Sequence, residues 1–566
     1  MIGVIAKSDE KNIVQEFFEL FKTPWEFYRE GELYDVLLCC GENCGIQNEA
    51  LTVIYSAEKV RLDSLLEINS LPQNDPEELV WKGVAFPIYT KMLVLECGGI
   101  AALTSKASGN ICGVLINQNQ QKIVRIGYDL FREVAFLLSS GQPVEYAEVP
   151  TLEVHIDILR DLMREAGVPF IEIPPVPYGY GYITCLTHDI DFAAVRNHKF
   201  DHTMFGFLYR AMWRTLCDAL KRKVPWQKLW NNLRAVLSLP AVYAGFAKDF
   251  WAQFDRYLEV EKGLRSTFFF LPFQGTPGAG TCEVAPGKRA GKYDIDDQRE
   301  HILKIQSEGC EIGLHGIDAW GDPEKGKREV KRIASVTGRP VSGVRIHWLY
   351  LSKESPKLLE QAGLTYDSTW GYNEAVGFRA GTAQAYRPLD TEGFLELPLL
   401  IQDTAMFYSG RMGLREDKAF ILCQEVMKNV SAYGGVLVIN WHDRSLEPER
   451  LWGDFYKKLL NEIKSRRVWF GTGSEVTQWF KRRRLVRFNQ VEMNEEVLKI
   501  RLEGLEESDV PDLMLKIYGP WAKDNALHTS VNKPAEIAIH RDTELNIPVK
   551  ELQNISYLES LSLCRN

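Results

Sequence analysis

The sequence predicts a mixed α/β protein whose central part, residues 176–480, folds as a distorted (β/α) barrel. Two observations support this prediction. Between about Gly181 and Phe480, short apolar runs alternate with amphipathic helical stretches, which is the pattern of parallel strands joined by helices. Several such units follow one another without a glycine-rich nucleotide-binding loop, and this favours a barrel over a doubly wound sheet.

The elements of this barrel can be placed along the chain from their apolar runs and helical periodicity. The expected strands are 182–187, 266–271, 311–314, 343–346, 364–367, 394–399, 436–440 and 468–471. The expected helices are 246–261, 297–307, 323–337, 353–362, 416–432 and 448–464.

The two flanking regions differ from the central one in their pattern of apolar and polar residues. Residues 1–175 mix helical and strand patterns, which predicts an N-terminal α/β domain of unknown role. The proline-rich segment 171–178 suggests a stiff linker. Residues 481–566 contain alternating patterns, as in 497–502 and 513–518, and few helical periods. They predict a small β-sandwich-like, β-rich module at the C-terminus.

Composition restricts the class of protein. The 566 residues are too many for one ordinary domain, and 45% hydrophobic with 25% charged residues is typical of a soluble globular protein. A net charge of −9 argues against nucleic acid as a partner. The sequence contains no long uninterrupted apolar run and no secretory signal pattern at its N-terminus, so we expect no transmembrane segment. The scattered cysteines are typical of reduced thiols and predict a cytoplasmic location.

A long segment separates the first two expected strands and includes a basic, aromatic stretch, 207–237. One interpretation is peripheral contact with a membrane surface or with an anionic, membrane-bound precursor. The other is a helical cap packed on the barrel, with its charges solvated. Because Pro225 interrupts the stretch, the cap is the interpretation that we favour.

Polar side chains gather where the expected strands end. The carboxyl ends of the strands in a β/α barrel converge on one face, where such enzymes keep their active sites. Histidine and aspartate without competing thiolates suit Zn²⁺ or another divalent first-row metal with an open position for water. Two aspartates as close as Asp189 and Asp191 need a cation or a proton to relieve their repulsion. The strand-end residues are His188, Asp189, Asp191, His315, Asp318, Arg345, His347, Asp367, Asp403, His442 and Asp443.

Several segments in this region resemble the motifs of the polysaccharide deacetylase superfamily. Thr187-His-Asp-Ile-Asp191 is similar to a variant of that family's first motif, and Glu311-Ile-Gly-Leu-His-Gly316 to the segment with its metal-binding histidine. Each segment is weak alone, but their order and spacing are specific. Further similar segments are Ser266-Thr-Phe-Phe-Phe-Leu271, Gly343-Val-Arg-Ile-His347, Tyr366-Asp-Ser-Thr369, Leu395-Glu-Leu-Pro398 and Val438-Ile-Asn-Trp-His442.

The resemblance implies a barrel of the polysaccharide deacetylase type that hydrolyses an N-acyl group, typically acetyl, on an amino sugar. It implies that Asp189 is the catalytic base and that His315 is a metal ligand. It also implies that His442 protonates the leaving amine and that Arg345 orients the base. The first motif matches a variant subgroup that we associate with bacterial surface-polysaccharide biosynthesis.

The chain departs from the family pattern at two positions. Ile190 separates two acids that are usually adjacent, which makes Asp191 the expected second ligand. Ala319 stands where the family has its second metal-binding histidine. His347 or Asp318 could supply the missing ligand, and we favour His347 because imidazole restores the usual donor set.

From the sequence we therefore expect a zinc-dependent carbohydrate deacetylase acting on an N-acylated sugar or glycan precursor. The substitution at Ala319 motivates an alternative, a catalytically degenerate barrel that binds glycans or serves as a scaffold. A glycoside hydrolase that uses paired acids is a further hypothesis, and its activity would survive a chelator.

Overall fold

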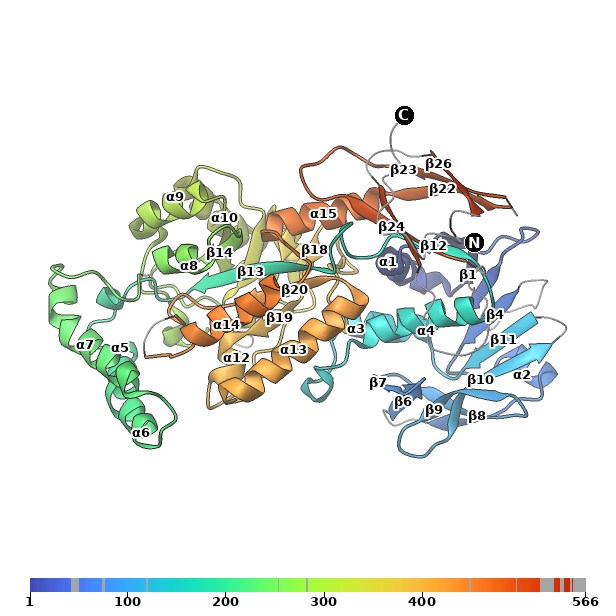
Figure 1. Ribbon diagram of the computed structural model, residues 1–566, viewed down its shortest axis with the longest axis horizontal. Coiled ribbons are helices and arrows are strands. Elements are labelled where there is room, and N and C mark those ends of the chain that lie inside the picture. Colours follow the sequence, from blue (N-terminus) through green and yellow to red (C-terminus); the bar gives the residue numbers. More distant parts are fainter. Residues whose placement is uncertain are drawn as a thin grey trace. The chain divides into compact units, whose positions relative to one another are not determined.

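The computed structural model describes residues 1–41, 50–73, 77–118, 121–252, 254–280, 284–446, 449–494, 496–519, 534–539, 544–549 and 552 (Figure 1). The chain forms two compact units. Unit 1 contains residues 1–179, 380–389 and 478–566, and unit 2 contains residues 180–379 and 390–477. The division into three domains expected from the sequence stays a prediction. Each helix in the described part of the chain is too short or too polar to cross a lipid bilayer.

The core of unit 2 is a parallel sheet. Its strands are ordered β18–β17–β16–β15–β14–β13–β20–β19, and β21 pairs with the start of β13. They are β13 (Tyr182–Ile190), β14 (Ser266–Phe270), β15 (Glu311–Gly316), β16 (Gly343–Ile346), β17 (Tyr366–Asp367), β18 (Leu395–Glu396), β19 (Leu399–Gln402), β20 (Val436–Asn440) and β21 (Val468–Phe470).

This sheet must curl, because its two edge strands are consecutive in the chain. Only Leu397 and Pro398 separate β18 from β19, so the two edges can be no more than about 11 Å apart at that point. All nine residues of β13 are buried, as expected for a strand covered on both faces. The mixed α/β class and the curled parallel sheet predicted from the sequence are confirmed.

Helices join the strands of unit 2. Helix α10 illustrates the local signals: Asp322 caps its first turn, Pro323 is its first residue, and Gly338 ends it at a φ of 66°. The connecting helices are α8 (Phe254–Val260), α9 (Arg299–Ser307), α10 (Pro323–Thr337), α11 (Ser355–Gln361), α12 (Asp403–Phe407), α13 (Glu416–Tyr433) and α14 (Gly453–Lys464). Helix α15 (Gly473–Leu485) follows the last strand, β21.

The long segment between β13 and β14 is mostly helical. It contains α5 (His202–Leu208), a π-helical turn (Tyr209–Arg214), α6 (Thr215–Leu220) and α7 (Trp226–Tyr243). These helices, green in Figure 1, have a small core of their own with Phe207, Leu239 and Trp251 among its buried residues.

Unit 1 is built on a mixed sheet ordered β2–β1–β3–β4–β11–β10–β9–β6–β7. Pairing is parallel from β2 to β11 and antiparallel beyond. The strands are β1 (Ile2–Ile5), β2 (Trp25–Phe27), β3 (Val36–Cys39), β4 (Leu51–Tyr55), β6 (Glu77–Trp81), β7 (Val84–Ile88), β9 (Ile100–Ser105), β10 (Ile111–Gln118) and β11 (Gln121–Ile126). The main helices are α1 (Lys11–Phe21), α3 (Leu130–Ser139) and α4 (Thr151–Glu165), with α2 (Arg61–Leu65) and the pair β5 (Asn69–Gln73) and β8 (Met92–Glu96) between them.

The C-terminal region is β-rich, as expected. Strands β22 (Arg487–Met493), β23 (Val497–Glu503) and β26 (Glu544–Pro548) form one antiparallel sheet. Strand β24 (Leu513–Tyr518) pairs with β25 (Ala535–Ile539) and with β12 (Phe170–Glu172). The expectation of a linker over 171–178 was therefore wrong for its first residues, because their backbone pairs with β24 and Ile171 and Ile173 are buried.

Candidate active site

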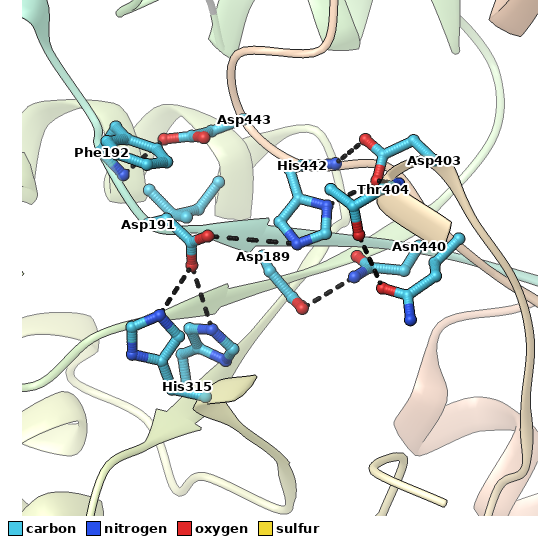
Figure 2. A network of polar contacts seen from close by, with 12 residues as sticks. Asp189, Asp191, Phe192, His315, Asp403, Thr404, Asn440, His442 and Asp443 are labelled. Carbon is cyan, nitrogen blue, oxygen red and sulfur yellow. Dashed lines mark hydrogen bonds and ion pairs between the residues drawn. The ribbon is translucent and has the colours of Figure 1, made fainter. Parts of the chain in front are cut away.

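Three residues that could hold a metal ion meet at the carboxyl ends of the strands in unit 2. Asp191 directly follows β13, His315 lies in β15 and His347 directly follows β16. The Oδ1 atom of Asp191 lies 3.2 Å from Nε2 of His315 and 3.5 Å from Nε2 of His347. One donor atom from each residue falls within 4.8 Å of the others. Figure 2 shows the Asp191 carboxylate between His315 and His442.

The chemistry of the donor set fits a cation. Nδ1 of His315 lies 2.9 Å from the Arg345 carbonyl oxygen, which can only accept, so Nδ1 carries the hydrogen. In the neutral ring Nε2 then presents a lone pair to Asp191. The buried Oδ1 of Asp191 has no hydrogen bond to any residue that the structure describes. Such a cluster of acceptors needs a proton or a cation between its members.

Electrostatics prepares these groups as ligands. Burial alone would raise the pKa of Asp191, but His347, His315 and His442 outweigh it and hold this pKa far below its ordinary value. Burial lowers the pKa of His347 well below its ordinary value, although Asp191 opposes the shift. A carboxylate and neutral imidazoles are the forms that bind a divalent metal.

The two alternatives for the third ligand occupy different places. Asp318 accepts hydrogen bonds from the Ala279 amide at 2.7 Å and the Lys325 ammonium at 3.2 Å, and it is not part of the three-residue group. Glu329 accepts from the amides of Ile317 and Asp318 at 3.1 and 2.7 Å, which holds the loop after β15. His347, rather than Asp318, is therefore the candidate ligand.

Asp189 lies beside this group and is held from two sides. The Asn440 side chain donates a 2.7 Å hydrogen bond to its Oδ2, and Nη1 of Arg345 lies 3.4 Å from its Oδ1. The buried Arg345 also donates to the Thr187 hydroxyl at 2.8 Å, and to the Ser368 carbonyl and hydroxyl at 2.7 and 2.8 Å. The carboxylate of Asp189 is thus fixed in one orientation near the metal-binding group (Figure 2).

His442 lies on the opposite side of Asp191, with its Nε2 4.0 Å from Oδ2 of Asp191. Its Nδ1 donates a 2.6 Å hydrogen bond to the buried Asp403, whose other oxygen accepts from the His442 amide at 2.9 Å. Burial lowers the pKa of His442, but Asp403 and then Asp191 and Asp189 raise it to about 10. This imidazole can therefore carry a proton at neutral pH.

Other strand-end residues lie outside the group. His188 is fully buried among aromatic rings, with Nδ1 2.8 Å from the Trp441 carbonyl oxygen and Nε2 3.0 Å from Glu261. Asp367 is buried beside Glu396, and burial raises the pKa of both carboxyls. These residues have structural positions. Alternation along β13 was the signal for His188, because it places that side chain on the opposite face from Asp189.

Two residues at the site were not among the predicted site residues. Asp403 was noted only as a strand-end acid, and its contact with His442 depends on two neighbouring strands, β19 and β20. Asn440 is the last residue of β20 and precedes His442 by two residues, a spacing that places two side chains on one side of an extended chain. That spacing was the available signal for Asn440.

The site opens into a cavity of about 810 Å³ that is lined by Asp191 and His347. Aromatic side chains form part of its wall, among them Phe192, Trp348 and Tyr408. Trp348 has a φ of 66° and Leu349 a φ of 55°, which is uncommon for large residues. This turn directly follows His347, so it shapes the backbone beside a candidate ligand.

Comparison with known proteins gives structural likenesses only. Neither protein-family models nor curated protein sequences match the chain. A protein described as a polysaccharide deacetylase from Mycobacterium smegmatis is 18% identical, at a TM-score of 0.35 over 57% of this chain and 98% of that one. One so described from Pseudomonas aeruginosa PAO1 is 13% identical, at a TM-score of 0.35 over 57% and 98%. An allantoinase is 14% identical, at a TM-score of 0.32 over 54% and 92%. None of them establishes an activity for this chain.

Proposed function

We propose that the chain is a metal-dependent hydrolase that removes an N-acyl group, in the first instance acetyl, from an amino sugar in a polysaccharide or glycan precursor. The observation that carries the proposal is the position of Asp189 and His442 around the group formed by Asp191, His315 and His347. An acid, a base and a cation site within one strand-end cluster are the parts that amide hydrolysis needs.

Asp191, His315 and His347 would hold the metal, with Zn²⁺ as the first candidate. The bound cation would polarise the acyl carbonyl and lower the pKa of a water molecule in its open position. Asp189 is oriented by Asn440 and Arg345, and it would accept the proton of the attacking water.

His442 would protonate the leaving amine. Its pKa, raised to about 10, keeps the ring charged at neutral pH, and its Nε2 faces the cation site while Nδ1 is bonded to Asp403. A charged donor fixed at that place lets the carbon–nitrogen bond break without expelling an amide anion.

The direct test measures released acetate with N-acetylglucosamine oligomers, using purified protein loaded with one equivalent of Zn²⁺. We expect chelator-sensitive release that Asp189→Asn abolishes while the metal stays bound, and that the surface control Asp255→Asn leaves unchanged. If Asp189→Asn released the metal and Asp191→Asn did not, the roles of base and ligand would be reversed. Glycosidic cleavage that survives the chelator would support the paired-acid glycoside hydrolase instead.

Ala319 supports a second candidate, a barrel that binds glycans or acts as a scaffold without catalysis. Its methyl side chain has no donor atom, so it supplies no ligand where the family that the chain resembles has a histidine. Metal content separates the two proposals. Less than about 0.2 equivalents of metal after mild purification would favour the scaffold, because an intact three-ligand site should retain Zn²⁺.

A further inference from the structure

A wall of arginines adjoins the candidate active site. The 810 Å³ cavity that reaches Asp191 and His347 shares four lining residues with a second cavity of about 1190 Å³. The shared residues are Arg210, Arg411, Arg444 and Tyr408, and Arg450 lines the second cavity only. The cation site thus lies on one side of these arginines and a large space on the other.

Three of these arginines are buried or half-buried and form no salt bridge with a residue that the structure describes. Arg444 is 7% exposed and Arg450 is 9% exposed. Counting only the described residues, no carboxylate forms an ion pair with Arg210, Arg444 or Arg450. Within the same part of the chain, Nε of Arg210, Nη1 of Arg444 and Nε of Arg450 are buried and donate no hydrogen bond.

Three other cations that line the second cavity lie beside a carboxylate. Arg415 is paired with Asp417 at 2.7 Å, Lys228 with Asp454 at 3.1 Å, and Arg214 lies 3.9 Å from Asp218. Lack of a partner is therefore a property of the inner arginines and not of every cation in this region.

Aromatic rings position the inner arginines without neutralising them. The guanidinium of Arg444 lies 3.7 Å from the centre of the Phe192 ring, and that of Arg450 lies 4.9 Å from Tyr408 and 5.2 Å from Trp452. Stacking occupies the faces of a guanidinium and leaves its N–H edges available to an anion.

The charges of these side chains are costly in the absence of an anion. Burial, together with the neighbouring Arg450 and Arg444, lowers the pKa of Arg210 to about 9, although Glu449 opposes the shift. Burial and Arg450 also lower the pKa of Arg444, against Tyr408, Glu449 and Asp443. Buried like charges are retained where a ligand supplies the opposite charge.

We propose that Arg210, Arg444 and Arg450 bind the phosphate or diphosphate group of the substrate, so that its acylated sugar lies in the cavity of Asp191 and His347. The anion site stands on the arginines alone, whereas its assignment to the substrate rests on the proposed function. Three guanidiniums match the charge and oxygen geometry of a diphosphate better than those of a single carboxylate. The 1190 Å³ cavity beyond them has room for the group attached to the phosphate.

The helices between β13 and β14, which line this cavity, favour a lipid as the group attached to the phosphate. Large apolar residues at helical spacing are exposed on them, with exposures of 43–78%. They are Phe205 in α5, Tyr209, Met212 and Trp213 in the π-helical turn that follows it, and Trp226, Trp230 and Leu237 in α7. Aromatic and apolar stripes beside cations are typical of helices that lie at a membrane surface. A lipid-linked sugar phosphate would reach the arginines from there.

Calorimetric titration with sodium pyrophosphate tests the anion site. The buffer contains EDTA, so that the probe cannot bind through a metal. We expect Arg444→Gln and Arg450→Gln each to weaken binding by about tenfold or more, because each removes charge-assisted hydrogen bonds. Arg415→Gln, at the rim, should bind like the unaltered protein. Pyrophosphate should also raise the melting temperature of the unaltered protein, and this readout needs no variant.

The outcomes separate this proposal from the proposed function. Absence of pyrophosphate binding, or equal binding in all variants, would overturn the anion site whatever the hydrolytic activity is. Pyrophosphate binding that depends on Arg444 and Arg450 would uphold it even if no acetate were released. Tighter binding of farnesyl diphosphate than of uridine diphosphate would identify a lipid carrier, which we expect, and the reverse order would identify a nucleotide.

Discussion

Asp403 holds His442 by two hydrogen bonds, one from the ring at 2.6 Å and one from the backbone amide at 2.9 Å. The Asp403 carboxylate is fully buried and cannot turn without breaking both bonds, and a turn of the His442 ring breaks the first of them. The hydroxyl of Ser445 also donates to Asp403. The orientation and the charge of His442 therefore depend on one carboxylate that lies across a pair of neighbouring strands.

Asp403→Asn should lower kcat by at least about tenfold with little change in KM, because Asp403 acts on the proton of His442 and not on the substrate. His442 must be protonated to act as an acid, and Asp403 raises its pKa to about 10. In the variant the pKa of His442 falls, so the alkaline limb of the activity profile should move to lower pH. A pH profile of kcat measures the shift. An alkaline limb that stays in place would contradict this role for Asp403.

His347→Ala should release the metal, whereas Asp318→Asn should retain it. Only His347 lies with Asp191 and His315, since Asp318 bonds to Ala279 and Lys325. Metal content by elemental analysis, before and after dialysis, gives the comparison. Release from Asp318→Asn and retention in His347→Ala would reverse the assignment of the third ligand.

Arg345→Lys should reduce both stability and activity, although it keeps the charge. The guanidinium of Arg345 donates hydrogen bonds to Thr187, Ser368 and Asp189 at once, and the ammonium of a lysine cannot reach all three. We expect a loss of about 2 kcal/mol or more in the free energy of unfolding, with kcat lower by about tenfold or more. Urea unfolding and kinetics measure the two effects. Arg265→Lys, at an exposed pair with Glu475, is the control and should change neither.

Glu153→Gln should stabilise unit 1 at neutral pH. Burial raises the pKa of Glu153 from 4.5 to about 7, although Thr382 and Gln384 donate hydrogen bonds to it. A raised carboxyl pKa means that stability is fully present below pH 4.5 and is lost as pH rises to about 7. That loss is about 3 kcal/mol and is absent in the glutamine variant. The melting temperatures of the variant and the unaltered protein should therefore match near pH 4, and the variant should melt higher at pH 8. The same difference at both pH values would show that the ionisation of Glu153 is not its cause.

Much of the barrel could be predicted because its strands are short, buried on both faces and separated by amphipathic helices. The expected strands 343–346 and 436–440 match β16 and β20. The expected helix 323–337 matches α10, whose capping residues Asp322 and Gly338 are typical of helix ends. The strand over 394–399 was expected as one element but is two, β18 and β19, because Pro398 interrupts the pairing.

The sequence by itself determined the class of sheet and the set of polar residues at its strand ends, because apolar runs and their spacing are local properties. Only the tertiary structure decided which of these residues meet. That Asp191 meets His315 and His347 depends on the ends of three separate strands. The bond from His442 to Asp403 and the unpaired arginines beside it depend on distances between separate strands and loops. Such distances follow from the packing of the whole unit, and local sequence patterns do not contain them.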